Sequence, residues 1–212
     1  MKKVLMLLAA AALMASPALG AITNTKHDLS SGSAATIKGT STELCVYCHT
    51  PHGALTGGFA ALWNRNNGSD PTGFYNSSTM QGTTSNAGIL TSDAKLCLSC
   101  HDGASLTGAL RNPPNSGGAV PLVQVGATAN LGPDMTNDHP VGFSYQSAIT
   151  NGDTELVAAA TVATNGLKIN YGASNNEMWC SSCHDVHGGV VGTPFLAKSN
   201  VGSALCLTCH VK

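Results

Sequence analysis

The apolar residues of this chain form one continuous run near its start and are scattered thinly after it. Residues 4–15 read VLMLLAAAALMA, follow Lys2 and Lys3, and lead to the small residues around Gly20. A basic head, an apolar stretch too short to cross a bilayer and small residues at the cleavage point are typical of a secretory signal peptide. We therefore expect residues 1–20 to be removed. The remainder, residues 21–212, is expected to be exported and to have no integral membrane segment.

Beyond residue 20 the pattern predicts little regular structure. Long apolar periods of the kind that mark core helices are hard to find, and residues 154–163 (TELVAAATVA) could form a helix or equally a strand. Short helices are expected where Ser92–Asp93, Asn176–Glu177 and Ser203 can cap the turns that follow them. Aromatic residues make up only 5% of the chain, so an ordinary hydrophobic core is undersupplied. We predict a mostly coil fold with a few short helices, whose interior is filled by something besides side chains.

The cysteines share one spacing. All eight fall into four Cys-x-x-Cys pairs, and each pair is followed at once by a histidine. This spacing places both sulfurs on one side of a helical turn, where each can form a thioether to a porphyrin vinyl group, and the histidine can ligate the iron. We therefore expect four covalently attached haem c groups, which form the core as a stack. The attachment residues are Cys45, Cys48, Cys97, Cys100, Cys180, Cys183, Cys206 and Cys209, and the proximal ligands are His49, His101, His184 and His210.

Cys-x-x-Cys pairs also have two other common uses in proteins. Four pairs could close two zinc sites, or they could form disulfides in an exported protein. Neither scheme needs a histidine directly after every second cysteine. Haem attachment accounts for the cysteines and for these histidines together.

Four further histidines remain, one for each expected haem: His27, His52, His139 and His187. Ligation of every iron by two histidines needs this number of distal ligands. The alternative axial ligands are Met80, Met135 and Met178, which are better suited to packing against porphyrin faces. With both axial positions filled, no iron is left open for a substrate, and we expect the protein not to be an enzyme.

Chain length limits which iron each distal histidine can reach. Two ligands on opposite faces of one haem have Cα atoms some 12 Å apart, whereas three residues span at most about 10 Å when fully extended. His52 therefore cannot serve the haem held by His49, and His187 cannot serve the haem held by His184. Each of them is expected to reach a different iron.

A specific pairing follows from this limit. His27 and His139 are expected to serve the first haem of their own halves, those of His49 and His184. We expect His187 to cross to the haem of His101. His52 is expected to ligate the His210 haem of the next subunit, with His27 as the alternative donor between subunits.

The ligands are arranged as an internal duplication. Each half carries a lone histidine, a Cys-x-x-Cys-His-x-x-His element and a plain Cys-x-x-Cys-His element, over about residues 21–111 and 134–212. The connection between them is rich in proline, glycine and asparagine. We expect one tetrahaem domain with two dihaem repeats, because too few core residues exist to separate two domains.

The charge of the chain excludes one class of partner. Ten Lys and Arg against eleven Asp and Glu give a net charge of −1, and removal of the two lysines of the signal peptide makes it −3. No basic stripe is present to hold phosphates, so nucleic acid is not an expected partner.

The elements CVYCHTPHG and CSSCHDVHGG, the two plain motifs and HDLS near the mature start together resemble the exported multihaem c-type cytochromes of metal-reducing bacteria. The resemblance covers His27 to His210. It implies a coil-rich fold, bis-histidine ligation throughout, and extracellular electron transfer as a subunit of a conducting head-to-tail homopolymer at the outer cell surface. Redox proteins or extracellular acceptors would be its other partners. The alternatives are a multihaem reductase with one open iron and a monomeric periplasmic electron shuttle.

Overall fold

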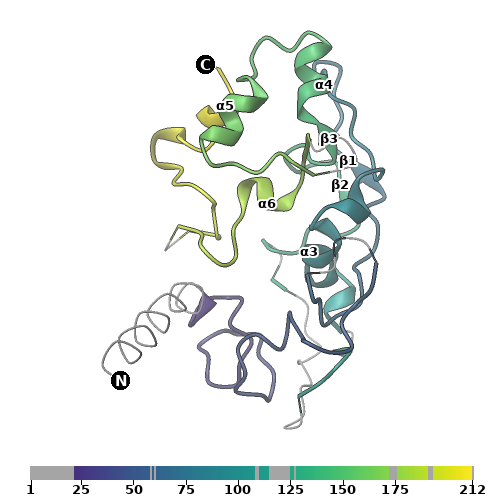
Figure 1. The fold of residues 1–212 in the computed structure, drawn as a ribbon, viewed down its shortest axis with the longest axis vertical. Coiled ribbons are helices and arrows are strands. Elements are labelled where there is room, and N and C mark those ends of the chain that lie inside the picture. Colours follow the sequence, from purple (N-terminus) through teal and green to yellow (C-terminus); the bar gives the residue numbers. More distant parts are fainter. Residues whose placement is uncertain are drawn as a thin grey trace, which may run out of the picture.

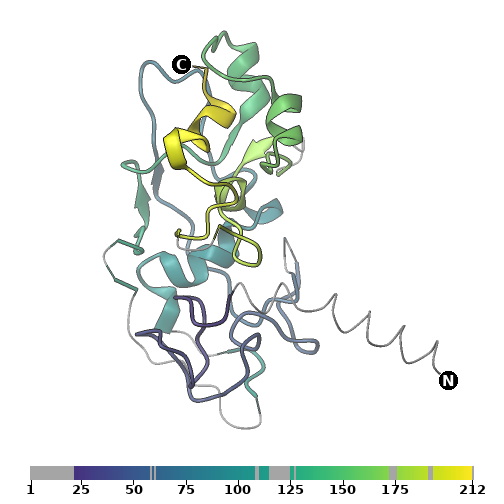
Figure 2. The ribbon, with the colours of Figure 1, turned by 90° about the vertical axis from the view of Figure 1, so that its left-hand side faces the viewer.

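The computed structural model describes residues 22–57, 59, 61–107, 110–114, 125–126, 128–171, 176–190 and 193–211. The expected signal peptide and the middle of the connection between the halves lie outside these ranges. In the described part of the chain, no helix has the length and apolar character that a membrane crossing requires. Most of the first half of the chain lies toward one end of the long axis and most of the second half toward the other, although the segment around Gln81 runs up to the end of α4 (Figures 1 and 2).

Regular elements are few and short within the described ranges. The longest helix is α3 (Ala94–His101), and the others are α4 (Tyr145–Thr150), α5 (Ala159–Thr164), α6 (Cys180–Cys183) and α7 (Cys206–Cys209). Three single 3₁₀ turns cover Ile89–Thr91, Ser105–Thr107 and Val201–Ser203. Strand β1 (Gly73–Phe74) pairs in parallel with β2 (Asp134–Met135), and β3 (Phe143–Ser144) pairs antiparallel with β4 (Glu177–Met178). The prediction of a mostly coil fold with short helices is confirmed.

The helix starts agree with the sequence in part. Helix α3 begins after Asp93, as expected, although the Asp93 side chain does not cap it. The expected start at Asn176–Glu177 is wrong, because Glu177 lies in β4 and pairs with Ser144. Helix α6 begins instead after Trp179, whose backbone N–H donates to Ser182 Oγ at 3.0 Å. Of the ambiguous segment 154–163, the last residues form most of α5.

The apolar interior is divided into three small clusters, and each contains or contacts haem-attachment cysteines. The first is centred on Phe143, Tyr145 and Val162, and it includes Cys209 and contacts Cys183. A second, around Leu98 and Trp179, contacts Cys180, and a third, around Tyr47 and Leu106, contacts Cys100. The side chains therefore gather where the haems would be attached.

Candidate haem sites

Each Cys-x-x-Cys-His motif forms one helical turn. The backbone N–H of His49 donates to the Cys45 carbonyl at 2.8 Å, that of His184 to Cys180 at 3.1 Å, and that of His210 to Cys206 at 2.9 Å. The motif ending at His101 forms the second half of α3. A helical turn brings residues three apart to the same side, so the two sulfurs of each motif are placed as thioether attachment requires.

Hydrogen bonds fix the tautomer of three proximal histidines. Nδ1 of His49 lies 2.8 Å from the Ala61 carbonyl, Nδ1 of His101 lies 2.6 Å from that of Ala129, and Nδ1 of His184 lies 2.8 Å from that of Pro194. A carbonyl oxygen can only accept, so Nδ1 carries the proton and donates it. Nε2 is then left with its lone pair, which is the form of imidazole that ligates a metal.

The carbonyls that accept these protons come from segments that fold back onto the motifs. His49 and Trp63 form a β-bridge, and His184 and Leu196 form the corresponding bridge in the second half. Beside them, the Asn64 N–H donates to the Cys48 carbonyl and the Ala197 N–H to the Cys183 carbonyl, both at 2.8 Å. Both Cys-x-x-Cys-His-x-x-His elements are therefore built in the same way.

Three pairs of imidazole rings lie at the separation that two ligands of one iron would have. The ring centres of His27 and His101 are 5.9 Å apart, those of His49 and His187 are 5.9 Å apart, and those of His139 and His210 are 6.3 Å apart. Two metal–imidazole bonds of about 2 Å, each with roughly 1 Å more to the ring centre, separate two rings on one iron by about 6 Å. The donor chemistry and the spacing fit bis-histidine haem.

This pairing differs from the one expected from the sequence. His27 faces His101 instead of His49, and His187 faces His49 instead of His101. The reason is that the N-terminal segment folds across to α3 and stacks the His27 ring on Phe195 at 4.6 Å. Burial, followed by the charges of His101 and His184, lowers the pKa of His27 to about 4, which keeps this ring neutral as a ligand.

The expected ligand of the His210 haem is also replaced. His139 faces His210, whereas His52 was expected there from a neighbouring copy. Among the described residues, the rings of His184 and His52 face no other ring, and both side chains are exposed. One proximal and one distal histidine are therefore left over within the chain.

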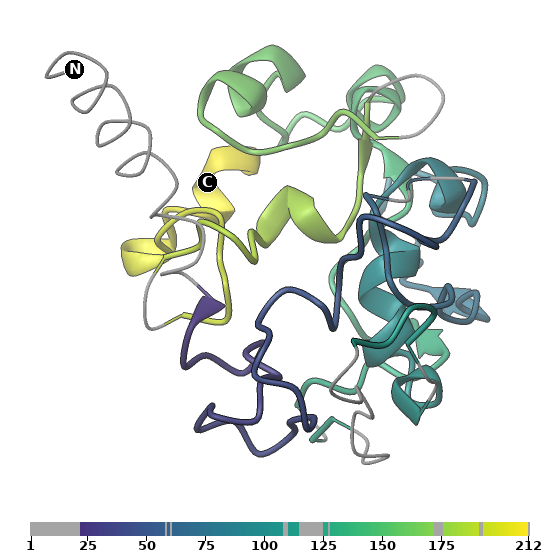
Figure 3. The same cartoon turned by 60° about the horizontal axis from the view of Figure 1, so that its bottom comes forward.

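The attachment sites follow one another in a row. Cys48 and Cys100 are close enough for Cys100 to raise the pKa of Cys48, and Cys209 raises the pKa of Cys183 in the same way, after burial in each case. Cys97 and Cys180 interact directly, and this contact is the largest cause that raises the pKa of Cys97. The four motifs are thus linked in chain order, with α6 between α3 and the C-terminal turn (Figure 3).

The zinc and disulfide alternatives find no support in the side-chain positions. All eight cysteines lie within the described ranges, and none forms a disulfide. Within the same ranges, no group of three or more histidine, cysteine or acidic side chains is gathered as a zinc site requires. Met135 and Met178 are buried in the apolar clusters, and Met80 packs against one of them.

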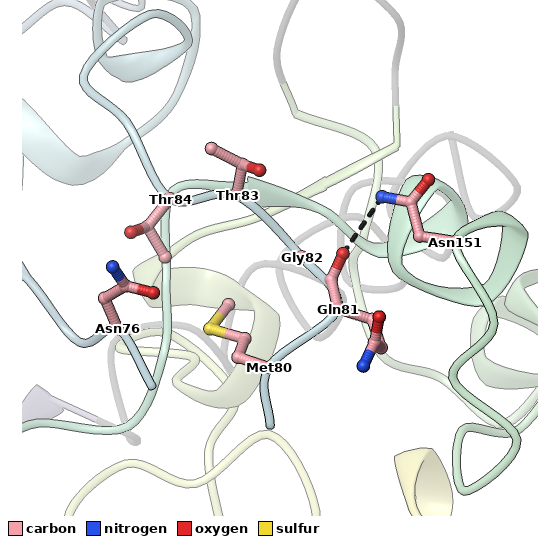
Figure 4. Close-up of a pocket in the computed structure, with 7 residues that line it drawn as sticks. All are labelled: Asn76, Met80, Gln81, Gly82, Thr83, Thr84 and Asn151. Carbon is pink, nitrogen blue, oxygen red and sulfur yellow. Dashed lines mark hydrogen bonds between the residues drawn. The ribbon is translucent and has the colours of Figure 1, made fainter. Parts of the chain in front are cut away.

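A polar pocket of about 560 Å³ lies away from these ligands. Asn151, at the end of α4, donates from Nδ2 to the Gln81 carbonyl across it at 3.0 Å (Figure 4). It is lined by Asn76, Met80, Gln81, Gly82, Thr83, Thr84 and Asn151. The lining contains no titratable group and no haem ligand, so we assign no chemistry to it.

Sequence reasoning missed one buried cation. Arg65 is 2% exposed, and its Nη2 donates to the carbonyls of Ser105 and Leu106 at 3.2 and 2.9 Å. Its charge acts to lower the pKa of both Cys48 and Cys100, which places it between the first two attachment sites. Nothing in the sequence around Arg65 distinguishes it from the surface arginine Arg111.

The motif turns, the tautomers and the facing rings define a haem c-binding cytochrome. Residues 173–212, which carry the third and fourth motifs, match the family model of the doubled CXXCH motif. This match supports a multihaem c-type cytochrome that binds haem c covalently, which implies electron transfer, and cytochromes of this type are exported beyond the cytoplasm. A comparison with curated proteins gave no match.

Proposed function

We propose that the chain binds four haems, each ligated by two histidines, and that it conducts electrons instead of catalysing a reaction. Haem iron supplies a one-electron couple at each site. The observation that carries the proposal is the set of three facing imidazole pairs at 5.9, 5.9 and 6.3 Å. Ligands held on both sides leave no open position on those irons and change little between oxidation states.

The protein around the ligands supports the same role. The Nδ1 hydrogen bonds hold three proximal rings in one orientation. Cys97 contacts Cys180, and Cys48 and Cys183 lie near enough to Cys100 and Cys209 for these sulfurs, after burial, to raise their pKa, so neighbouring attachment sites are close together. A chain built in this way presents a continuous row of sites, which suits conduction from one end of the subunit to the other.

The leftover histidines suggest how subunits join. We propose that His52 of one copy ligates the iron held by His184 of the next copy, so that coordination itself links a homopolymer. His52 is suited to this because its ring is exposed while its backbone is held. Its carbonyl accepts hydrogen bonds from Thr50 Oγ1 at 2.8 Å and from Asn112 Nδ2 at 2.9 Å. The alternative donor, His27, is engaged with His101 inside the chain.

The polymer proposal also draws on resemblance. The number and order of the ligands are similar to those of OmcE, an outer-surface tetrahaem cytochrome whose subunits form conducting filaments. By this likeness the protein would act at the cell surface and pass electrons to extracellular acceptors. Net charge is small and would oppose association of copies only weakly.

A second function is favoured by the same leftover site. If the His184 iron keeps an open position in the native protein, the chain is a multihaem reductase with its substrate bound there. A third possibility, a monomeric periplasmic shuttle, would need another ligand at this iron. An open iron gives a high-spin signal that changes on addition of cyanide or nitrite, whereas two histidines give a low-spin signal that does not.

Intact mass and spin state of native protein test the proposal together. We expect a mass increase of four haems and no thiol that reacts with an alkylating reagent, because eight thioethers use every cysteine. All irons of the assembled protein should be low-spin in both oxidation states and insensitive to cyanide. Fewer haems, bound zinc or a substantial high-spin fraction in the assembled protein would reject the proposal.

A further inference from the structure

The two halves of the chain meet at a buried acidic side chain. Asp93, directly before α3, is 8% exposed. Its Oδ2 accepts the backbone N–H of Ser181 in α6 at 2.9 Å. Helix α3 carries Cys97, and α6 begins with Cys180, so this hydrogen bond holds together the two turns whose sulfurs are in contact.

The second oxygen of Asp93 has a different environment. Oδ1 is buried and has no hydrogen-bond partner. A buried carboxylate oxygen without a partner destabilises the ionised form, because the charge loses its hydration without compensation. Burial accordingly raises the pKa of Asp93, although the Ser181 hydrogen bonds and the charge of Lys168 oppose the rise.

Few charges surround this group. From the segment after α5, Lys168 and Tyr171 face it. Lys168 is exposed, and the Tyr171 hydroxyl contacts Ser181 Oγ. From α3 and α6 come Cys97 and Cys180, which become thioethers and lose their protons when haem is attached. Tyr171 is buried as well, but burial and the charge of Asp93 raise the pKa of its hydroxyl above the ordinary value, so it keeps its proton. Among these groups Asp93 is then left as the buried acid that can change its charge.

We propose that Asp93 is a proton-binding site coupled to electron arrival at the second and third haems. An electron that enters either haem from a redox partner removes one positive charge from beside the carboxylate. The Asp93 carboxylate then binds a proton from solvent, which becomes an O–H on one of its oxygens, and it releases this proton when the electron leaves. The junction between the halves thus takes up an electron and a proton together.

The sign of the coupling follows from electrostatics. A nearby positive charge favours the carboxylate, and its loss favours the acid, so proton affinity is higher in the reduced state. The pH at which Asp93 is half-protonated therefore differs between the oxidised and the reduced protein. Between these two pH values the reduction potential falls as pH rises, and outside them Asp93 leaves the potential constant. Each tenfold difference in affinity corresponds to about 59 mV for a one-electron couple.

The test is a spectroelectrochemical titration of the fully loaded protein over a series of pH values. Asp93→Asn keeps an oxygen that can accept the Ser181 N–H, so the junction is preserved while the titration is removed. We expect this variant to lose a pH-dependent component of the potential and to have higher potentials than wild type at high pH. Unchanged pH dependence in Asp93→Asn would overturn the proposal.

Asp70→Asn is the matched control. The Asp70 side chain is 62% exposed and pairs with Lys95 of α3 at 2.6 Å. Its replacement removes the same unit of charge near α3, but from solvent, where screening is strong. The control is expected to keep the wild-type pH dependence.

A second measurement needs no variant. The reduced-minus-oxidised infrared difference spectrum of protein containing ¹³C-labelled aspartate should show a labelled carboxylic acid band that appears on reduction. Absence of that band would also overturn the proposal. The inference rests on haems at Cys97 and Cys180, and haem mass and spin state test that premise separately, so failure of Asp93 is distinguishable from failure of the proposed function.

Discussion

The two Cys-x-x-Cys-His-x-x-His elements have the same spacing but opposite relations to the other histidines. In the first element, the proximal His49 faces His187, while the distal His52 is exposed and faces no described ring. In the second, the distal His187 is the ring that is used, and the proximal His184 is the one without a facing ring. One element therefore lacks an iron for its spare ligand, and the other lacks a ligand for its iron. The two elements together carry enough histidines, but within one copy the distal His52 and the proximal His184 stay unpaired. A head-to-tail contact between copies would pair them.

We expect the largest effect on folding from removal of haem from both elements. The apolar clusters are small and meet at the attachment cysteines, so the chain without haem should not fold, as small metal-dependent domains do not fold without metal. Expression without a c-type haem maturation system should give a disordered or degraded chain. Circular dichroism and limited proteolysis would show this, and a cooperative unfolding transition of the apo chain would contradict it.

Replacement of the second histidine of each element distinguishes the two elements. His52→Ala should mature with four haems but leave the iron of His184 without its distal ligand and yield short or monomeric particles. His187→Ala is the matched control, because it should free the iron of His49 within the chain and still polymerise. Haem counts, spin state and light scattering measure these outcomes. Normal filaments with all irons low-spin in His52→Ala would show that His52 is not the link.

The loop around the first motif offers a test of packing. A Cβ atom on Gly39 would lie 2.4–2.6 Å from the hydroxyl oxygen and two ring carbons of the fully buried Tyr47. We expect Gly39→Ala to lower the free energy of unfolding by about 1–3 kcal/mol through overpacking. Gly32→Ala is the control, since a Cβ there meets nothing within 4 Å. Denaturant unfolding followed at the Soret band would compare them, and equal stability of the two variants would contradict the prediction.

The smallest effect is expected at the last motif. The buried Tyr145 hydroxyl bonds to the carbonyls of Val157 and Cys209, both at 2.9 Å. Tyr145→Phe should cost about 1 kcal/mol, because the Cys209 carbonyl keeps the Val157 N–H as a partner. The same unfolding assay measures it, and a loss as large as that of Gly39→Ala would show that the hydroxyl does more than anchor this turn.

The sequence predicted local features better than tertiary ones. The helical turns at the cysteine motifs follow from the spacing of residues along the chain, and each motif is only five consecutive residues long. Which ring faces which depends on how the chain folds back. His27, near in sequence to His49, lies against His101 because Phe195 stacks on it. No spacing rule in the sequence contains that contact.

The short span between the two histidines of each Cys-x-x-Cys-His-x-x-His element correctly excluded them from sharing one iron. The specific pairing of histidines that was inferred from this limit was less accurate. His52 and His49 do not face each other in the structure, and neither do His187 and His184, in keeping with the short span between them. The role of Asp93 was missed in a different way. It was expected as a helix cap, but its carboxylate accepts a hydrogen bond from α6, a contact between residues 88 positions apart.

The most direct test of the central claim is a count of low-spin irons in assembled and dissociated native protein. Electron paramagnetic resonance of the oxidised samples, with particle size measured in parallel, gives this count. The account predicts four low-spin irons per subunit in the polymer and three in the monomer, with the fourth high-spin and open to cyanide. Four low-spin irons in a stable monomer would contradict coordination between subunits.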